Sequence, residues 1–193
     1  MEIIRPSSKE VNNYLKLWDS LENYVLQENS LRKLFSVTYP LNNNLDDVLI
    51  KVCSLNDFYS TKIFSPFTVA KHIVPLDIDE KLIREDLSLV NKIADIKMPG
   101  GKNKNFYSFA TKYCSHHKPT VYPIYDFYVE KMLIHFKKRD EFYEFKKDDL
   151  KTYPKYRNIL LKFREHYKLD KFDLKQIDKY LWLAGKKYFS KKY

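Results

Sequence analysis

The spacing of apolar residues constrains the fold more than any other feature of this sequence. Apolar residues recur at intervals of three and four along most of the chain, and no segment of useful length alternates apolar and polar residues. A capping box from Ser7 to Glu10 follows Pro6 and precedes the first such face. The residues of this face are Val11, Tyr14, Leu15, Trp18, Leu21 and Val25. The pattern predicts an all-α protein.

Proline and polar breaks separate the further helices. Helices are predicted over residues 48–59, 67–73, 105–117, 127–136 and 155–167, and a last one begins after Asp173. A long helix is also predicted after Asp77 or Asp79, with its inner side formed by Leu82, Ile83, Val90, Ile93 and Ile96. We expect a single helical domain over residues 1–193, with a basic C-terminal helical extension at 150–193.

The charge balance points to a polyanionic partner. Lysine and arginine outnumber aspartate and glutamate by 35 to 25, which gives a formal net charge of +10. Such a surplus attracts polyanions, and nucleic acid is the commonest of these for a basic protein. The alternative is a lysine-rich surface that is simply solvated. With only 3 glycines, the chain does not support a glycine-rich phosphate loop or a flexible linker.

The cysteines, the histidines and the first residues bear on cofactors and compartment. Cys53 and Cys114 stand among apolar neighbours, and we expect both to be small buried hydrophobes in a reducing cytoplasm. Two cysteines cannot supply the four ligands of an iron–sulfur cluster. His116 and His117 are adjacent, so on a helix they diverge and cannot chelate one metal ion together. We expect no metal, no organic cofactor, no signal peptide and no membrane span.

Residues 98–136 carry the most informative pattern. A glycine hairpin precedes the helix at 105–117, and it reads Met98-Pro99-Gly100-Gly101-Lys102-Asn103-Lys104. The loop that leads to the next helix reads Lys118-Pro119-Thr120-Val121-Tyr122-Pro123-Ile124-Tyr125-Asp126. A carboxylate at a helix N-terminus is held rigid and ionised, and it stabilises the positive charge that builds on a sugar when its N-glycosidic bond breaks. The plain alternative is that Asp126 only caps the helix, although one residue can do both.

This stretch resembles the helix-hairpin-helix DNA glycosylase superfamily. The likeness is greatest to its 8-oxoguanine DNA glycosylase-like branch and to compact bacterial relatives of that branch, and it covers roughly residues 45–136. The resemblance implies a helix-hairpin-helix glycosylase-like fold with Asp126 as the catalytic aspartate. It also implies that the hairpin grips the DNA backbone through Pro99, Gly100 and Gly101.

Family members that also cut the DNA strand use a lysine at the start of the hairpin helix as an amine nucleophile. The resemblance makes Lys104 the best match to this residue and Lys102 the second. The alternative is that both lysines only contact phosphates. The hairpin departs from the family pattern, because Gly100-Gly101 replaces Gly-x-Gly and the interval from Lys104 to Asp126 is a few residues longer. Strand cleavage therefore remains an open alternative.

Other residues are expected to contact DNA. The family fills the gap left by a flipped base with a short polar stretch at a helix end, for which Asn56, Tyr59 and Thr61 are the candidates. A helix end that merely carries polar residues is the alternative. Asn105 and Lys118 flank the hairpin helix, and we expect both at the DNA backbone.

The candidate residues of a base pocket are Tyr122, Tyr125 and His117, and the pocket residues of the family branch itself are not recognisable in this sequence. Either tyrosine ring can stack on an everted base, and burial of one ring between helices is the alternative. The resemblance as a whole predicts a monomeric DNA glycosylase that binds duplex DNA, needs no protein partner, and flips and excises one damaged base such as an oxidised purine.

Three alternatives remain open from the sequence. The first is a glycosylase that removes a hypermodified base from phage DNA in antiviral defence. The second is a non-catalytic DNA-binding protein with the same fold, and the third is a helical protein-interaction domain whose charge is incidental. The sequence names neither the excised base nor the oligomeric state.

Overall fold

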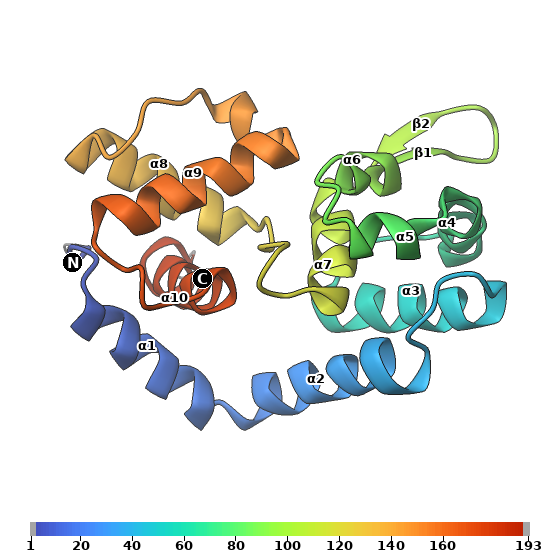
Figure 1. The fold of residues 1–193 in the computed structure, drawn as a ribbon, viewed down its shortest axis with the longest axis horizontal. Coiled ribbons are helices and arrows are strands. Elements are labelled where there is room, and N and C mark those ends of the chain that lie inside the picture. The colour runs from blue at the N-terminus through green and yellow to red at the C-terminus, as the bar shows by residue number, and fades with distance from the viewer. Residues whose placement is uncertain (1–2, 191–193) are drawn as a thin grey trace. The chain divides into compact units, whose positions relative to one another are not determined.

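The computed structural model describes residues 3–190, and helices make up most of them (Figure 1). The predicted helical class is confirmed. The chain divides into two compact units, one of which interrupts the other in sequence. We call residues 26–122 the inserted unit, and residues 3–25 together with 123–190 the terminal unit. The segment 150–190, predicted as an extension, belongs to the terminal unit with the N-terminal residues.

The terminal unit is built around the last helix of the chain. Its elements are α1 (Ser8–Ser20), the start of α2 (Glu22–Lys33), α8 (Phe127–Asp140), the 3-10 helix η3 (Lys147–Lys151), α9 (Tyr153–His166) and α10 (Leu174–Phe189). Side chains cap α1, α8 and α10, through Ser7, Asp126 and Asp173 respectively. Helix α10 packs against both α8 and α1. The rings of Tyr14 and Tyr180 meet edge to face between α1 and α10, 5.4 Å apart.

The inserted unit surrounds helix α7. Its elements are the π-helix η1 (Leu34–Thr38), α3 (Leu45–Tyr59), α4 (Pro66–Ile73), the 3-10 helix η2 (Val74–Leu76), α5 (Ile78–Ile83), α6 (Leu89–Ala94), β1 (Asp95–Lys97), β2 (Asn103–Asn105) and α7 (Tyr107–His117). Helix α3 packs against α4 and α7, and α6 packs against α7. Every residue of α7 from Phe109 to His116 is buried, which makes α7 the centre of this unit.

Two predicted helices are shorter than the sequence pattern suggested. The first ends at Ser20, because Leu21 leaves the helical conformation with φ −92° and ψ 79°. The predicted long helix is interrupted between α5 and α6, where Glu85 has φ 57° and the carboxylate of Asp86 accepts from the Ser88 N–H at 2.9 Å. Ile83, predicted to face inward, is 73% exposed. Local side-chain bonds to the backbone thus replace a helical turn here.

Two further predictions were wrong in detail. Strands β1 and β2 pair antiparallel with Ile96 opposite Lys104. No strand was predicted here, because three residues per strand are too few to show an alternating pattern. Cys114 is buried as predicted, whereas Cys53 is exposed. The buried face of α3 includes Val52, and Cys53 lies one residue further round the helix. Among the described residues, no helix has the length and hydropathy that a membrane span requires.

Candidate functional site

The glycine hairpin is an exposed β-turn that leads directly into α7. The Met98 N–H donates to the Lys102 carbonyl at 2.8 Å, and Gly100 and Gly101 have φ of 85° and 83°. Residues other than glycine rarely adopt such φ values, so the turn requires both glycines. All residues from Pro99 to Asn105 are exposed, Lys102 and Lys104 included.

Asn105 joins this hairpin to the helix that follows it. Its side-chain carbonyl accepts from the Tyr107 N–H at 3.1 Å, and its amide donates to the Asp95 carboxylate at 2.5 Å. The first bond satisfies an N–H in the first turn of α7, and the second crosses from β2 to β1. Asn105 therefore has a structural role in addition to the DNA contact expected from the sequence.

The polar residues at the end of α3 shape the loop between α3 and α4. The side-chain carbonyl of Asn56 accepts from the Thr61 hydroxyl at 2.8 Å and the Ile63 N–H at 2.9 Å, and its amide donates to the Ile63 carbonyl at 3.0 Å. The Tyr59 hydroxyl lies 3.0 Å from Nε2 of His116 on α7. These candidate plug residues hold the loop in place. Besides Ser60 and Lys62, the loop presents the apolar side chain of Phe64 to solvent, and this residue is 95% exposed.

Sequence reasoning missed Phe64. It stands between Ile63, which is 3% exposed, and Ser65, just before the first residue of α4. In a short loop, periodicity does not show which of two adjacent apolar residues turns inward. The only signal was an aromatic residue within a polar segment.

His117 belongs to a buried hydrogen-bond network centred on Asn42. The side-chain carbonyl of Asn42 accepts from Lys51 Nζ at 2.5 Å and from the Tyr113 hydroxyl at 2.6 Å, and it lies 3.2 Å from His117 Nε2. Burial lowers the pKa of Lys51 to about 8. Burial and, to a lesser degree, the nearby Lys51 charge lower the pKa of His117 to about 3, so its ring is neutral at pH 7.

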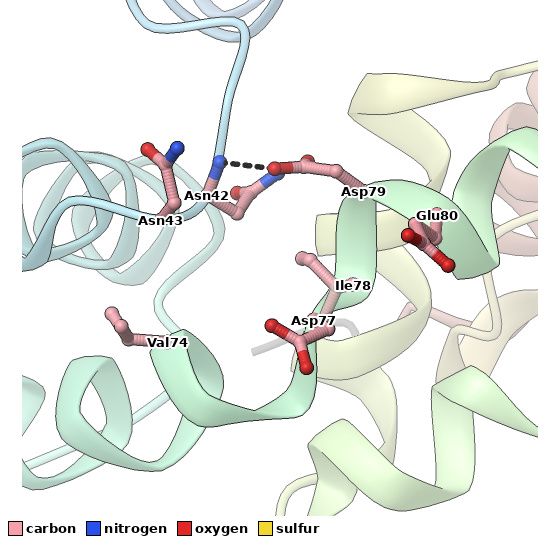
Figure 2. A pocket seen from close by; sticks show the side chains of 7 residues that line it. All are labelled: Asn42, Asn43, Val74, Asp77, Ile78, Asp79 and Glu80. Atoms are coloured by element: carbon pink, nitrogen blue, oxygen red, sulfur yellow. Dashed lines mark hydrogen bonds between the residues drawn. The ribbon is translucent and has the colours of Figure 1, made fainter.

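A pocket of about 200 Å³ opens beside this network (Figure 2). Asn42 links the two, because its N–H and its side-chain amide both donate to the Asp79 carboxylate, at 2.8 and 2.5 Å. The residues that line the pocket are Asn42, Asn43, Val74, Asp77, Ile78, Asp79 and Glu80. Three carboxylates make this pocket unsuitable for a phosphate group.

Lys118 and Tyr122 lie at the C-terminal end of the inserted unit. Tyr122 is fully buried, and its hydroxyl donates to the Asp86 carbonyl at 3.2 Å. Lys118 lies 3.7 Å from the Glu85 carboxylate and donates to the Ile83 carbonyl at 3.4 Å. In this conformation the Tyr122 ring presents no face on which a base can stack.

Asp126 stands at the end of the loop that follows α7, immediately before the first residue of α8. One carboxylate oxygen accepts from the Tyr128 N–H at 2.8 Å, which confirms that Asp126 caps α8. Among the residues that the structure describes, its second oxygen has no hydrogen-bond partner, and the side chain is partly exposed. The Tyr153 hydroxyl donates to the Pro123 carbonyl at 2.9 Å and the Tyr156 hydroxyl to the Ile124 carbonyl at 2.5 Å. Two buried tyrosines thus fix the segment that carries this carboxylate.

Tyr125 faces away from solvent into a charged cluster. Its hydroxyl donates to the buried Glu130 carboxylate and accepts from Lys151, whose Nζ lies 4.0 Å from the Tyr125 ring centroid. Lys147 Nζ lies 3.3 Å from the other Glu130 oxygen. The pKa of Lys151 is lowered, mainly by burial, against the opposing effect of the Glu130 charge. As with Tyr122, burial leaves this ring no free face in the described conformation.

Helix α10 reaches the first turn of α8 at a glycine. A Cβ placed on Gly185 would lie 2.7 Å from the Tyr128 carbonyl oxygen and 2.8 Å from the Tyr128 Cβ. Only glycine allows this approach, two residues from Asp126. No sequence pattern identified this contact of α10 with α8.

The predicted site residues fall in both units. The hairpin residues, Asn56, Tyr59, Thr61, His117, Lys118 and Tyr122 lie in the inserted unit, whereas Tyr125 and Asp126 lie in the terminal unit. Within residues 3–190, no group of three or more His, Cys, Asp or Glu side chains is arranged to hold a metal ion.

Comparison with known proteins gives two matches. The HI_0787_N family, described as an N-terminal domain, matches residues 10–121. A Haemophilus influenzae protein described as an uncharacterized protein is 47% identical over 148 residues, which are 76% of this chain and 70% of that protein. No solved structure matches. The family match covers more than half of the chain, and the relative is similar over most of both lengths; the chain belongs to the HI_0787_N family.

Proposed function

We propose that this protein is a DNA glycosylase in which Asp126 assists hydrolysis of an N-glycosidic bond. The observation that carries the proposal is the state of the Asp126 carboxylate. One oxygen is fixed by the Tyr128 N–H, and the other has no hydrogen-bond partner in residues 3–190. The carboxylate is also held at a helix N-terminus, where negative charge is favoured.

In the proposed reaction, a water molecule adds to the sugar C1′ atom as the bond to the base breaks. The bonding electron pair leaves with the base, which takes up a proton from solvent, and Asp126 later returns to solvent the proton that it receives from water. The free oxygen of Asp126 accepts a proton from the attacking water, and the carboxylate stabilises the positive charge on the sugar. No residue has to move to make that oxygen available.

The hairpin supports DNA binding. Helix α6, the β-hairpin and α7 follow each other directly, and α6 packs against α7. This order is compatible with a helix-hairpin-helix element, although here the hairpin is a pair of short strands. The exposed Gly100-Gly101 turn allows close approach of a phosphate to the backbone, and Lys102 and Lys104 supply positive charge next to it.

Phe64 is the side chain best suited to fill the gap that an everted base leaves. It is 95% exposed on a loop that Asn56 holds in place. Apolar side chains inserted between base steps unstack and kink DNA. We assign this role to Phe64 in place of Asn56 and Thr61, whose polar atoms bond to the loop itself.

The experiment is a base-release assay with wild type and Asp126→Asn on duplexes that carry oxidised, alkylated, deaminated or phage-type modified bases. Asparagine caps helices as well as aspartate does, so the variant keeps its fold. We expect alkali-labile abasic sites with wild type, a loss of about 100-fold or more in the variant, and unchanged DNA binding. Strand breaks without alkali that disappear in Lys104→Gln assign the amine nucleophile.

A second function is favoured by the capping bond itself, since a residue fully explained as a helix cap needs no catalytic role. In that case the chain is a DNA-binding protein without glycosylase activity. Absence of base release with both wild type and Asp126→Asn, together with salt-sensitive DNA binding in both, selects this function.

A further inference from the structure

Both tryptophans of the chain lie in one cluster of rings in the terminal unit. The tryptophan cluster consists of Trp18 from α1, Tyr24 from α2, Tyr128 from α8 and Trp182 from α10. The Trp18 and Tyr24 rings stack with centroids 5.7 Å apart. Trp182 meets Tyr24 edge to face at 5.1 Å, Trp18 at 6.0 Å and Tyr128 at 6.5 Å.

None of these four residues is fully buried, although the indole N–H of Trp18 is covered. Each residue retains intermediate exposure, in contrast to the fully buried Tyr113, Tyr153 and Tyr156. The exposed Phe127 extends the cluster, because its ring lies 5.5 Å from that of Tyr128 and 55% of the residue is exposed. A contiguous group of partly exposed rings often marks a binding surface, whereas single exposed apolar residues are common on any protein.

Lysine side chains lie against the same rings. Lys179 Nζ is 4.6 Å from the Trp18 ring, and Lys186 Nζ is 5.0 Å from the rings of both Tyr24 and Trp182. Lys186 also donates to the Tyr24 hydroxyl. Helix α10 carries four lysines and one carboxylate, Asp178, which is buried. The surface therefore combines ring edges and faces with positive charge.

We infer that the tryptophan cluster binds single-stranded nucleic acid by stacking unpaired bases against its rings. Proteins that hold single strands without strong sequence preference combine aromatic stacking with a positive surface along the backbone. Lys179 and Lys186 attract the phosphates, and the rings take the bases. This activity goes beyond excision of a base from duplex DNA and does not depend on Asp126.

The chain offers a direct probe, because Trp18 and Trp182 are its only tryptophans. Their fluorescence is recorded while full-length protein is titrated with a thymidine oligonucleotide of about 12 nucleotides, a length within the range that such sites cover. We expect saturable quenching. Inorganic polyphosphate, which has the charge but no bases, is expected to bind the same lysines and to quench the tryptophans much less than the oligonucleotide does. Equal effects of both ligands, or no effect of the oligonucleotide, would overturn the inference.

Variants separate stacking from packing. Trp182→Leu is expected to weaken oligonucleotide binding about tenfold, and Lys179→Gln is expected to weaken it more than Lys138→Gln, which removes an exposed charge from α8. Circular dichroism checks that each variant folds. If Trp182→Leu unfolds, Lys179→Gln with Trp18→Phe provides the same comparison. Matched duplex that quenches the tryptophans at the same concentration as the single strand contradicts the single-strand assignment, whatever the base-release assay shows for Asp126.

Discussion

At the scale of single residues, the side-chain carbonyl of Asn42 shows which ring nitrogen of His117 carries a proton. Its side-chain carbonyl lies within 3.2 Å of donors on three side chains, Lys51, Tyr113 and His117. A carbonyl oxygen only accepts, so His117 donates through Nε2. Burial and, to a lesser degree, the Lys51 charge lower the pKa of His117 and favour the neutral ring, whose other nitrogen then carries no proton.

We predict that acid destabilises the protein through His117. Its pKa is about 3 when folded and about 6.5 when unfolded, so the unfolded chain binds one more proton between these values. The free energy of unfolding should fall as pH drops below 6.5, at up to about 1.4 kcal/mol per pH unit from this group. Urea unfolding at pH 7 and pH 5 measures the effect.

His117→Gln should reduce this pH dependence, because glutamine keeps a donor for Asn42 and does not titrate. His135 contributes a separate part, since burial also lowers its pKa. His166→Gln, at an exposed position, is the control for the effect of the substitution itself. If His117→Gln shows the same pH dependence as wild type, groups other than His117 cause the pH dependence of the unfolding free energy.

Lys51 shows which residue properties the sequence did not reveal. The apolar spacing of α3 predicts a buried face, and Lys51 lies on that face with 0% exposure. Its three hydrogen-bond acceptors are the carbonyls of Tyr39 and Leu41 and the side chain of Asn42. These acceptors come together only after the chain turns back before α3. A periodicity argument alone treats a lysine as solvent-facing.

At the scale of elements, the contact of α10 with α8 depends on Gly185. In Gly185→Ala, the added methyl group meets backbone and Cβ atoms of Tyr128 that have no room to move. We expect a loss of unfolding free energy at the upper end of roughly 1–3 kcal/mol. This exceeds the gain of about 1 kcal/mol in helix propensity. Chemical denaturation measures the balance.

The matched control is Lys187→Ala, which changes an exposed position of the same helix. It should alter stability by less than about 0.5 kcal/mol. A Gly185→Ala protein as stable as wild type would mean that the two helices separate without cost at this point.

The loop between α3 and α4 should depend on Asn56 for its conformation. Asn56→Ala removes three hydrogen bonds and leaves the Ile63 N–H without this acceptor, so we expect a loss of about 1–3 kcal/mol. Hydrogen exchange of the Ile63 amide should accelerate in the variant. Phe64→Ala is the control for stability, because that side chain is exposed and its removal leaves no cavity.

Elements with local start signals were the ones the sequence predicted well. Asp173 and Gln176 form both bonds of the capping box that opens α10, and Pro66 stands in the first turn of α4. The break after α5 was missed, because apolar spacing continues through it while Asp86 and Ser88 redirect the backbone. Asp126 could be placed at a helix start from local sequence, whereas its free second oxygen and the supporting Tyr153 and Tyr156 depend on distant contacts.

At the scale of the whole molecule, the two units should differ in their ability to fold as isolated fragments. Residues 26–122 are continuous, so a fragment of this span should retain helical circular dichroism and melt cooperatively. A fragment of residues 123–190 lacks α1, which packs on α10, and should be less stable and more prone to aggregate. A non-cooperative melt of the 26–122 fragment contradicts the prediction.

Because residues 26–122 separate the two segments of the terminal unit, this unit can complete its packing only late in translation. Helix α1 leaves the ribosome early with Val11 and Tyr14 uncovered, and its partner α10 is translated last of the described helices. At about 5–20 residues per second, the wait lasts roughly ten to thirty seconds. A chain that terminates early never covers this face and remains a substrate for chaperones and proteases. Helix α1 can therefore pack against α10 only after both the hairpin and the Asp126 segment have been translated.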